Sequence, residues 1–148
     1  MVGGLAASSW KDVTAIAPYT VIGLALSAVG AYYLNLLQLG DDMARSLGLS
    51  VEGARLGLTA VAALLAASAV SVAGLLGFVG LIVPHIVRLL VGSDYRYIIP
   101  GSAIFGVATV TLSDTAARLI LAPAELPVGI IMAFIGAPFF LFLLRKEV

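Results

Sequence analysis

Charged side chains are absent from four long stretches of this 148-residue sequence, and this distribution constrains the fold more than any other feature. The uncharged stretches are residues 13–40, 56–87, 97–113 and 126–144. A helix rising 1.5 Å per residue needs about 20 apolar residues to cross the roughly 30 Å hydrocarbon core of a bilayer. Hydrophobic residues make up 61% of the chain and charged residues only 11%. We therefore predict an all-α, polytopic membrane bundle.

The first and last stretches each have the length of one span, whereas the third reaches that length only by running through Asp114 to about residue 121. The second stretch is too long for one straight helix and too short for two with a loop. Glycines crowd its second half, which predicts a helix over 56–73, a turn near 74–77 and a shorter or irregular span to about residue 90. The total is about five spans.

The basic residues test this count, because cytoplasmic loops carry an excess of Lys and Arg. With five spans, Lys11 and Arg118 share one side. The other six basic residues share the opposite side, and they are Arg45, Arg55, Arg88, Arg96, Arg145 and Lys146. A four-span reading divides them less sharply, five against three. Five spans therefore predict an outside N-terminus and a cytoplasmic C-terminus.

Composition excludes several functions. Eight basic and eight acidic residues cancel, so no basic footprint for nucleic acid is present. The sequence has no cysteine, and its single His85 cannot form a metal site alone. It also lacks a phosphate-binding loop and a nucleophile elbow, which argues against an enzyme. No basic segment precedes an apolar core at the N-terminus, so a cleaved signal peptide is not expected.

The segment 39–52 carries the densest charge in the sequence. Gly40 permits a sharp bend, Asp41 is expected to cap a following helix, and Gly48 is expected to stop it. Met43 and Leu47 would then form a short amphipathic surface. Such a helix between two spans can present a compact surface to a partner, and the alternative is an ordinary solvated connection.

Longer motifs resemble one family over essentially the whole chain. They are Leu-Asn-Leu-Leu-Gln-Leu-Gly-Asp from Leu34, Phe-Val-Gly-Leu-Ile-Val-Pro-His-Ile-Val-Arg from Phe78, Glu-Leu-Pro-Val-Gly-Ile from Glu125 and Gly-Ala-Pro-Phe-Phe from Gly136. This pattern resembles the FecCD permeases, the inner-membrane subunits of binding-protein-dependent ABC importers for iron–siderophores, haem and cobalamin. The resemblance implies that residues 1–148 form one permease region, equivalent to the C-terminal half of a ten-helix permease of a bacterial or archaeal cytoplasmic membrane.

The resemblance also implies roles for particular residues. The 39–52 loop would be the cytoplasmic coupling loop that contacts a separate ATPase subunit, which hydrolyses the ATP, and no cofactor is bound directly. Its expected coupling residues are Leu39, Gly40, Asp41, Asp42, Ala44, Arg45, Leu47 and Gly48. Arg118 and Glu125 would dock a periplasmic or lipid-anchored substrate-binding protein. Motif positions with a structural role are Gly77, Gly80, Pro84, His85, Pro127, Gly129, Gly136 and Pro138.

Further partners implied are membrane lipid and either a second permease copy or the missing N-terminal half. Several alternatives stay open beside these roles. Asp114 and Arg118, four residues apart, can simply pair within one helix. His85 can be a ligand or proton relay, or can hydrogen-bond a neighbouring helix. Small residues four apart, such as Gly23 with Ser27 and Gly53 with Gly57, favour close helix packing.

Two other functions compete with the importer. The first is a homo-oligomeric channel or proton-coupled carrier that uses Asp114 as an intramembrane titrating group. The second is a permease fragment that folds but does not transport.

Overall fold

The computed structural model of the chain describes residues 8–120 and, beyond them, positions 129, 132–134, 136–138, 141 and 145. The elements within the described part are helices, as the sequence predicts. Their order is α1 (Trp10–Leu37), α2 (Asp41–Ser46), α3 (Val51–Ala73), α4 (Val79–Val91) and α5 (Tyr95–Ile120).

Three of these helices, α1, α3 and α5, are long and apolar enough to cross a membrane. The short apolar helix α4 has 13 residues, so it is about 20 Å long and falls short of a bilayer core of about 30 Å. The predicted helix, turn and shorter helix between residues 56 and 90 are thus confirmed, although α3 already begins at Val51. Most of the span expected over 126–144 lies outside the described residues.

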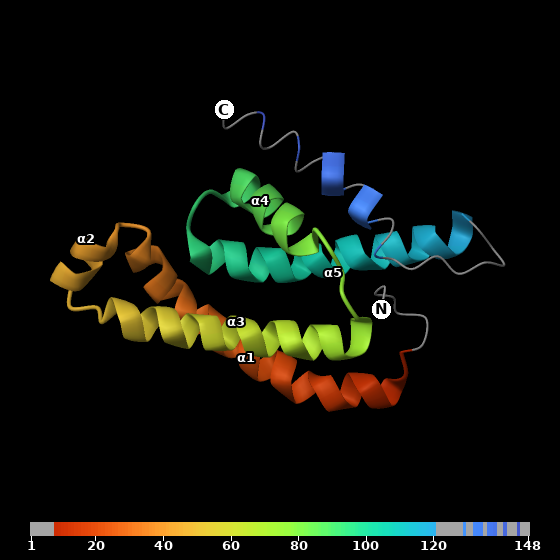
Figure 1. Cartoon of the computed structure of the whole chain (residues 1–148), viewed down its shortest axis with the longest axis horizontal. Coiled ribbons are helices and arrows are strands. Elements are labelled where there is room, and N and C mark those ends of the chain that lie inside the picture. The colour runs from red at the N-terminus through yellow and green to blue at the C-terminus, as the bar shows by residue number, and fades with distance from the viewer. Residues whose placement is uncertain are drawn as a thin grey trace.

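The helices run back and forth so that their ends gather at two sides (Figure 1). α1 packs against both α3 and α5, and α4 packs against α5 as a hairpin. The short helix α2 and the α4–α5 turn lie at one end of the bundle (Figure 1). The start of α1 and the α3–α4 connection lie toward the other end. α1 is therefore the helix that links α2, α3 and α5.

The connection between α3 and α4 is closed by unusual backbone geometry. Gly74, which ends α3, has a φ of 69°, and Phe78, which precedes α4, has a φ of 65°. A left-handed conformation is rare for a bulky residue and needs support from its surroundings. Gly136 leaves space for the Phe78 side chain, because a Cβ at position 136 would overlap it. The motif glycine at 136 thus makes room for the bend between α3 and α4.

Close packing of α1 on α3 depends on glycine. A Cβ at Gly23 would lie 2.5 Å from Leu65 Cδ2, and one at Gly30 would lie 2.7 Å from Leu58 Cδ2. In lipid, where helices associate through packing rather than hydrophobicity, small residues let two backbones approach. The expected role of Gly23 is confirmed, whereas a Cβ at Gly57 would meet no other atom within 4 Å.

The substitution Gly23→Val is therefore expected to destabilise the bundle by about 1–3 kcal/mol, the usual range for overpacking a tight contact. Thermal unfolding of the purified protein in detergent measures this loss. Gly57→Val is the matched control, since the same side chain there enters open space on α3. Equal melting temperatures for the two variants would contradict the packing role of Gly23.

Candidate functional site

The helix α2 is a short projection with a defined start and stop. Gly40, with a φ of 93°, makes the bend that precedes it. At its end, the Gly48 N–H donates to the Arg45 carbonyl at 2.9 Å and the Leu49 N–H donates to the Ala44 carbonyl at 3.0 Å. This paired arrangement is a Schellman turn, which requires a left-handed residue, and Gly48 has a φ of 85°. The predicted bend and stop are both confirmed.

Asp41 has a different role from the one expected. The residue before the helix is Gly40, and no side chain caps the helix start. Asp41 is instead the first helical residue, and its Oδ1 lies 2.7 Å from Nη2 of Arg55 on α3. The expectation of a cap by Asp41 was wrong, because an arginine 14 residues further along the chain offers the carboxylate a charged partner. This ion pair ties α2 to α3.

The surface of α2 divides into an inner and an outer side. Ala44 is completely buried and anchors the helix against the bundle. Leu39, Met43 and Leu47 are each more than half exposed, at 59%, 55% and 59%. Asp42 and Arg45 are exposed beside them. The outward face is thus an apolar patch flanked by both charges, with a hollow of about 440 Å³ beside it. Of the predicted coupling residues, Ala44 faces inward.

A polar cluster joins the end of α1 to the turn before α5. The Asn35 Nδ2 donates to Asp94 Oδ1 at 2.6 Å, and the Tyr95 backbone N–H donates to Asn35 Oδ1 at 2.9 Å. One turn further, Gln38 Nε2 donates to the Ser93 carbonyl at 3.1 Å. This cluster was not predicted from the sequence. A signal was present, since Ser-Asp before an apolar helix is a capping pattern and Asn35 and Gln38 interrupt an apolar helix end.

Hydrogen bonds lower the pKa of Asp94 below its ordinary value. The Arg96 backbone N–H contributes most and the Asn35 amide comes second. Burial opposes them, and the Arg96 charge adds the smallest lowering effect. Each of these donors favours the carboxylate over the neutral acid. The charged form of Asp94 is therefore the one that fits this site.

Two arginines at the end of the bundle that carries α2 make cation–π contacts with tyrosine rings. The Arg88 guanidinium lies 5.6 Å from the Tyr95 ring centre and also donates to its hydroxyl at 3.1 Å. The Arg96 guanidinium lies 5.9 Å from the Tyr32 ring centre. Arginine and tyrosine side chains are both typical of the membrane–water interface. The contacts fix these cations at the end of the bundle that carries α2.

At the opposite end of α5, Arg118 Nε lies 2.8 Å from Asp114 Oδ2, as expected for a pair four residues apart. The Asp114 side chain is 19% exposed and that of Arg118 is 54% exposed. The carboxylate is thus neutralised within its own helix, while the guanidinium still reaches the surface. Glu125 and Pro127 lie outside the described residues.

The other predicted motif residues lie along α4 and beyond it. Gly80, Pro84 and His85 are on α4, and Gly77 lies just before it. His85 is half-buried and has an interaction partner. Gly129, Gly136 and Pro138 are helical positions. Within the part of the chain that the structure describes, no group of three His, Cys, Asp or Glu side chains could hold a metal ion.

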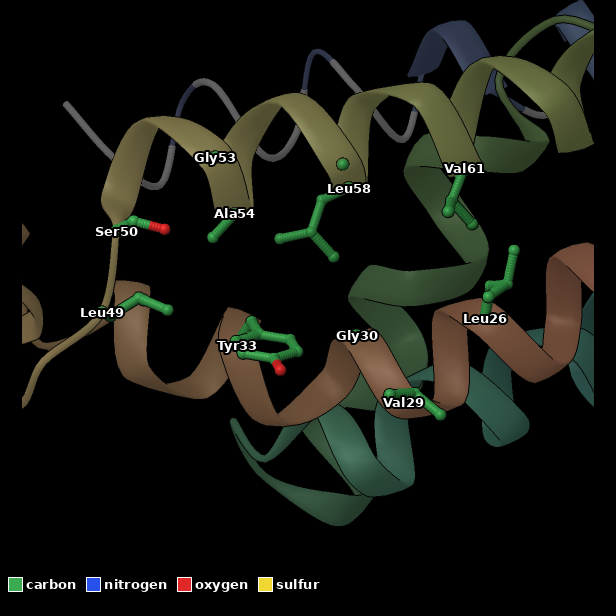
Figure 2. Close-up of a pocket in the computed structure, with 11 residues that line it drawn as sticks. Leu26, Val29, Gly30, Tyr33, Leu49, Ser50, Gly53, Ala54, Leu58 and Val61 are labelled. Carbon is green, nitrogen blue, oxygen red and sulfur yellow. The ribbon is translucent and has the colours of Figure 1, made fainter.

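A groove of about 380 Å³ opens between α1 and α3, next to the segment that follows α2 (Figure 2). Tyr33 and Leu58 point into it from the two helices, and Leu49 and Ser50 close its end (Figure 2). Its lining has no charged side chain. The groove therefore suits an apolar neighbour and not a charged chelate.

Apolar helices with charges gathered at their ends define a polytopic helical membrane protein. The chain belongs to the FecCD transport family, which it matches over residues 1–146. This confirms the resemblance carried by the motifs.

Curated relatives of the chain are named as import permeases. It is 47% identical to the Fe(3+)-citrate import system permease protein YfmD of Bacillus subtilis, over 99% of this chain and 44% of that protein. It is 40% identical to the hemin transport system permease protein HmuU of Yersinia pestis, over 98% of this chain and 43% of that protein. It is 49% identical to the cobalamin import system permease protein BtuC of Halobacterium salinarum, over 99% and 39%.

The fold also matches a solved ABC transporter of the metal-chelate type in an inward-facing conformation. The TM-score is 0.91 at 32% identity, over 98% of this chain and 47% of that one. The chain thus spans less than half the length of the relatives it matches.

The substitution Asp94→Asn is expected to lower the melting temperature at neutral pH while keeping the cap geometry. Because the folded-state pKa of Asp94 lies below its ordinary value of 3.8, the stabilisation is present above that pH and is lost as the pH falls through the folded-state pKa. Melting curves of both proteins from neutral to acidic pH measure the difference. Asp42→Asn on α2 is the charge-matched control, and a difference that persisted undiminished in acid would contradict the role of the Asp94 charge.

Proposed function

We propose that this chain is part of the transmembrane permease of an ABC importer for a metal chelate, and that α2 couples it to a separate ATPase subunit. The observation that carries the proposal is the outward face of α2. This face carries exposed apolar side chains flanked by charges, on a short helix that is fixed at both ends. Such a surface is suited to binding a protein partner. Because the chain belongs to the FecCD transport family, the proposed partner is an ATPase subunit.

The proposed orientation places α2 in the cytoplasm of a bacterial or archaeal cell, and the N-terminus outside. Four of the basic residues lie on α2 or on the ends of α3, α4 and α5 at the same end of the bundle, namely Arg45, Arg55, Arg88 and Arg96. Lys11 and Arg118 lie at the other ends of α1 and α5. This asymmetry is the one that membrane insertion favours for a cytoplasmic side.

The proposed mechanism is mechanical. When two ATP-loaded subunits close, they displace α2, and α2 carries the ends of α1 and α3 with it. The bundle then tilts and opens the pathway toward the other side. The chain covers less than half of its relatives, and the proposed partners for the rest of the pathway are a second permease copy or the missing N-terminal half.

Iron–siderophore, haem or cobalamin complexes are the proposed substrate class, since relatives are named for iron citrate, hemin and cobalamin. In such a complex the metal is already coordinated by its chelator, so the permease itself needs no metal ligand. The substrate would be delivered by a binding protein that docks on the outer end of α5.

Crosslinking tests the coupling contact directly, because the chain has no native cysteine. Met43→Cys on α2 is expected to crosslink to the ATPase subunit in the assembled complex. Leu119→Cys is the control, since that side chain is 76% exposed but lies at the far end of α5. Crosslinks at 119 without any at 43 would refute the proposed orientation. Transport that survives deletion of α2 would favour a channel or carrier.

Docking of the binding protein gives a second test. Arg118→Gln is expected to slow association of the substrate-loaded binding protein about tenfold or more at low salt, since exposed charges mainly set encounter rates. Surface plasmon resonance on the membrane-embedded complex measures the rate and its salt dependence. Arg55→Gln removes a similarly exposed arginine on the other side and should leave association unchanged. An equal effect of both substitutions would contradict docking at Arg118.

A further inference from the structure

The first turn of α5 is completed by a side chain from another helix. A helix start leaves four backbone N–H groups without partners in the helix itself. In α5 the Arg96 N–H donates to Asp94 Oδ1 at 2.9 Å, and those of Tyr97 and Ile98 donate to the Asp94 carbonyl at 3.1 Å. The Tyr95 N–H is satisfied by Asn35 of α1, at 2.9 Å. The start of α5 is thus built jointly by α1 and by its own cap residue.

Three positions on one face of α1 hold this start. Tyr32, Asn35 and Gln38 are three residues apart, so they lie along one side of the helix. Tyr32 lies under the Arg96 guanidinium, Asn35 bonds both Asp94 and Tyr95, and Gln38 bonds the Ser93 carbonyl. The α1 and α5 ends are therefore fastened over the last two turns of α1.

The contact between α1 and α5 lies on the structural route from α2 to the far end of α5. Only three residues separate Leu37, the end of α1, from Asp41, the start of α2. From its fastened start, α5 has 26 residues and reaches Arg118 in its last turn, which is a distance of about 35–40 Å along one helix. α2 is also joined to α3, by four intervening residues and by the exposed pair Asp41–Arg55, but it is α1 and not α3 that packs against α5. The polar link from α2 toward Arg118 thus runs through α1 and α5.

We propose that Asn35 and Asp94 form a transmission joint that makes α5 follow the movement of α2 and so links ATPase closure to the binding-protein end at Arg118. The proposal rests on the function proposed above. Both residues act as positioning residues, because they hold the α1 and α5 ends together. Reciprocal coupling follows, so that docking at Arg118 also biases α2.

A swap of the two side chains tests the joint. Asn35→Asp sets a carboxylate against Asp94 and is expected to break the pairing. In the double variant Asn35→Asp with Asp94→Asn, the amide and the carboxylate exchange places, and the carboxylate now on α1 can still accept the Tyr95 N–H. The double variant is therefore expected to restore the joint. Asp12→Asn is the matched control, because Asp12 also caps a helix start but bonds only Ser9 of the same segment.

The first measurement does not need the ATPase. Spin labels at Met43→Cys on α2 and Leu112→Cys on α5, both exposed, report the distance between the two helices in nanodiscs. We expect a narrow distance distribution in the parent protein, in the Asp12→Asn control and in the swapped variant, and a broad one with Asn35→Asp. If Asn35→Asp does not fold, Gln38→Leu removes one bond of the same fastening and is expected to broaden the distribution less. An unchanged distribution in Asn35→Asp, or in Gln38→Leu where only that variant folds, would overturn the joint.

The second measurement uses the reconstituted complex without labels. Stimulation of ATP hydrolysis by the binding protein is expected to fall about tenfold in Asn35→Asp, a typical size for coupling between sites, while basal hydrolysis persists. The swapped variant is expected to recover it. If the swapped variant recovers neither the narrow distance distribution nor the stimulation of ATP hydrolysis, these two side chains do not form the joint. A parent complex without any stimulation would instead contradict the proposed function, and the distance measurement would still decide the joint.

Discussion

A helix leaves unpartnered backbone N–H groups at its start and C=O groups at its end, and the described helices of this chain satisfy them in different ways. The end of α2 bonds back on itself in a Schellman turn at Gly48, and the end of α3 closes through the Gly74 N–H to the Val70 carbonyl. The start of α5 uses a neighbouring helix instead, through Asn35. A helix end whose backbone groups bond to a neighbouring helix is held to that helix, whereas an end that bonds to its own backbone is not.

The helix α1 carries two different kinds of contact on its two sides. Toward α3 it offers glycine, and the packing there is steric, as at Gly23 against Leu65. Toward α5 it offers hydrogen-bonding side chains at Asn35 and Gln38. Steric packing uses no directional bond, whereas a set of directed hydrogen bonds fixes register. The sequence of α1 therefore encodes one sterically packed surface and one hydrogen-bonded surface.

Local patterns in the sequence predicted the features that depend on local physics. Absence of charge located α1, α3 and α5, and the glycines from Gly74 onward located the break before α4. The bend at Gly40 and the stop at Gly48 followed from backbone preferences of glycine, and the Asp114–Arg118 pair from helical spacing.

Contacts between distant segments could not be read in the same way. Asp41 was misassigned because its partner Arg55 lies beyond a turn, and the Asn35–Asp94 bond joins residues 59 apart in the sequence. The inward direction of Ala44 and the left-handed backbone of Phe78 also depend on neighbours that only the folded chain brings together.

The ion pair between α2 and α3 and the hydrogen-bonded contact between α1 and α5 differ in what it costs to break them. The exposed ion pair Asp41–Arg55 contributes about 0–1 kcal/mol, so the buried Ala44 and the chain segments on either side of α2 are its main attachment to the bundle. Separating α1 from α5 would release the Asn35 amide, the Tyr95 N–H and the Asp94 carboxylate together, and each would need a new partner. The contact between α1 and α5 is therefore the costlier of the two to break, which is the property that the proposed joint requires.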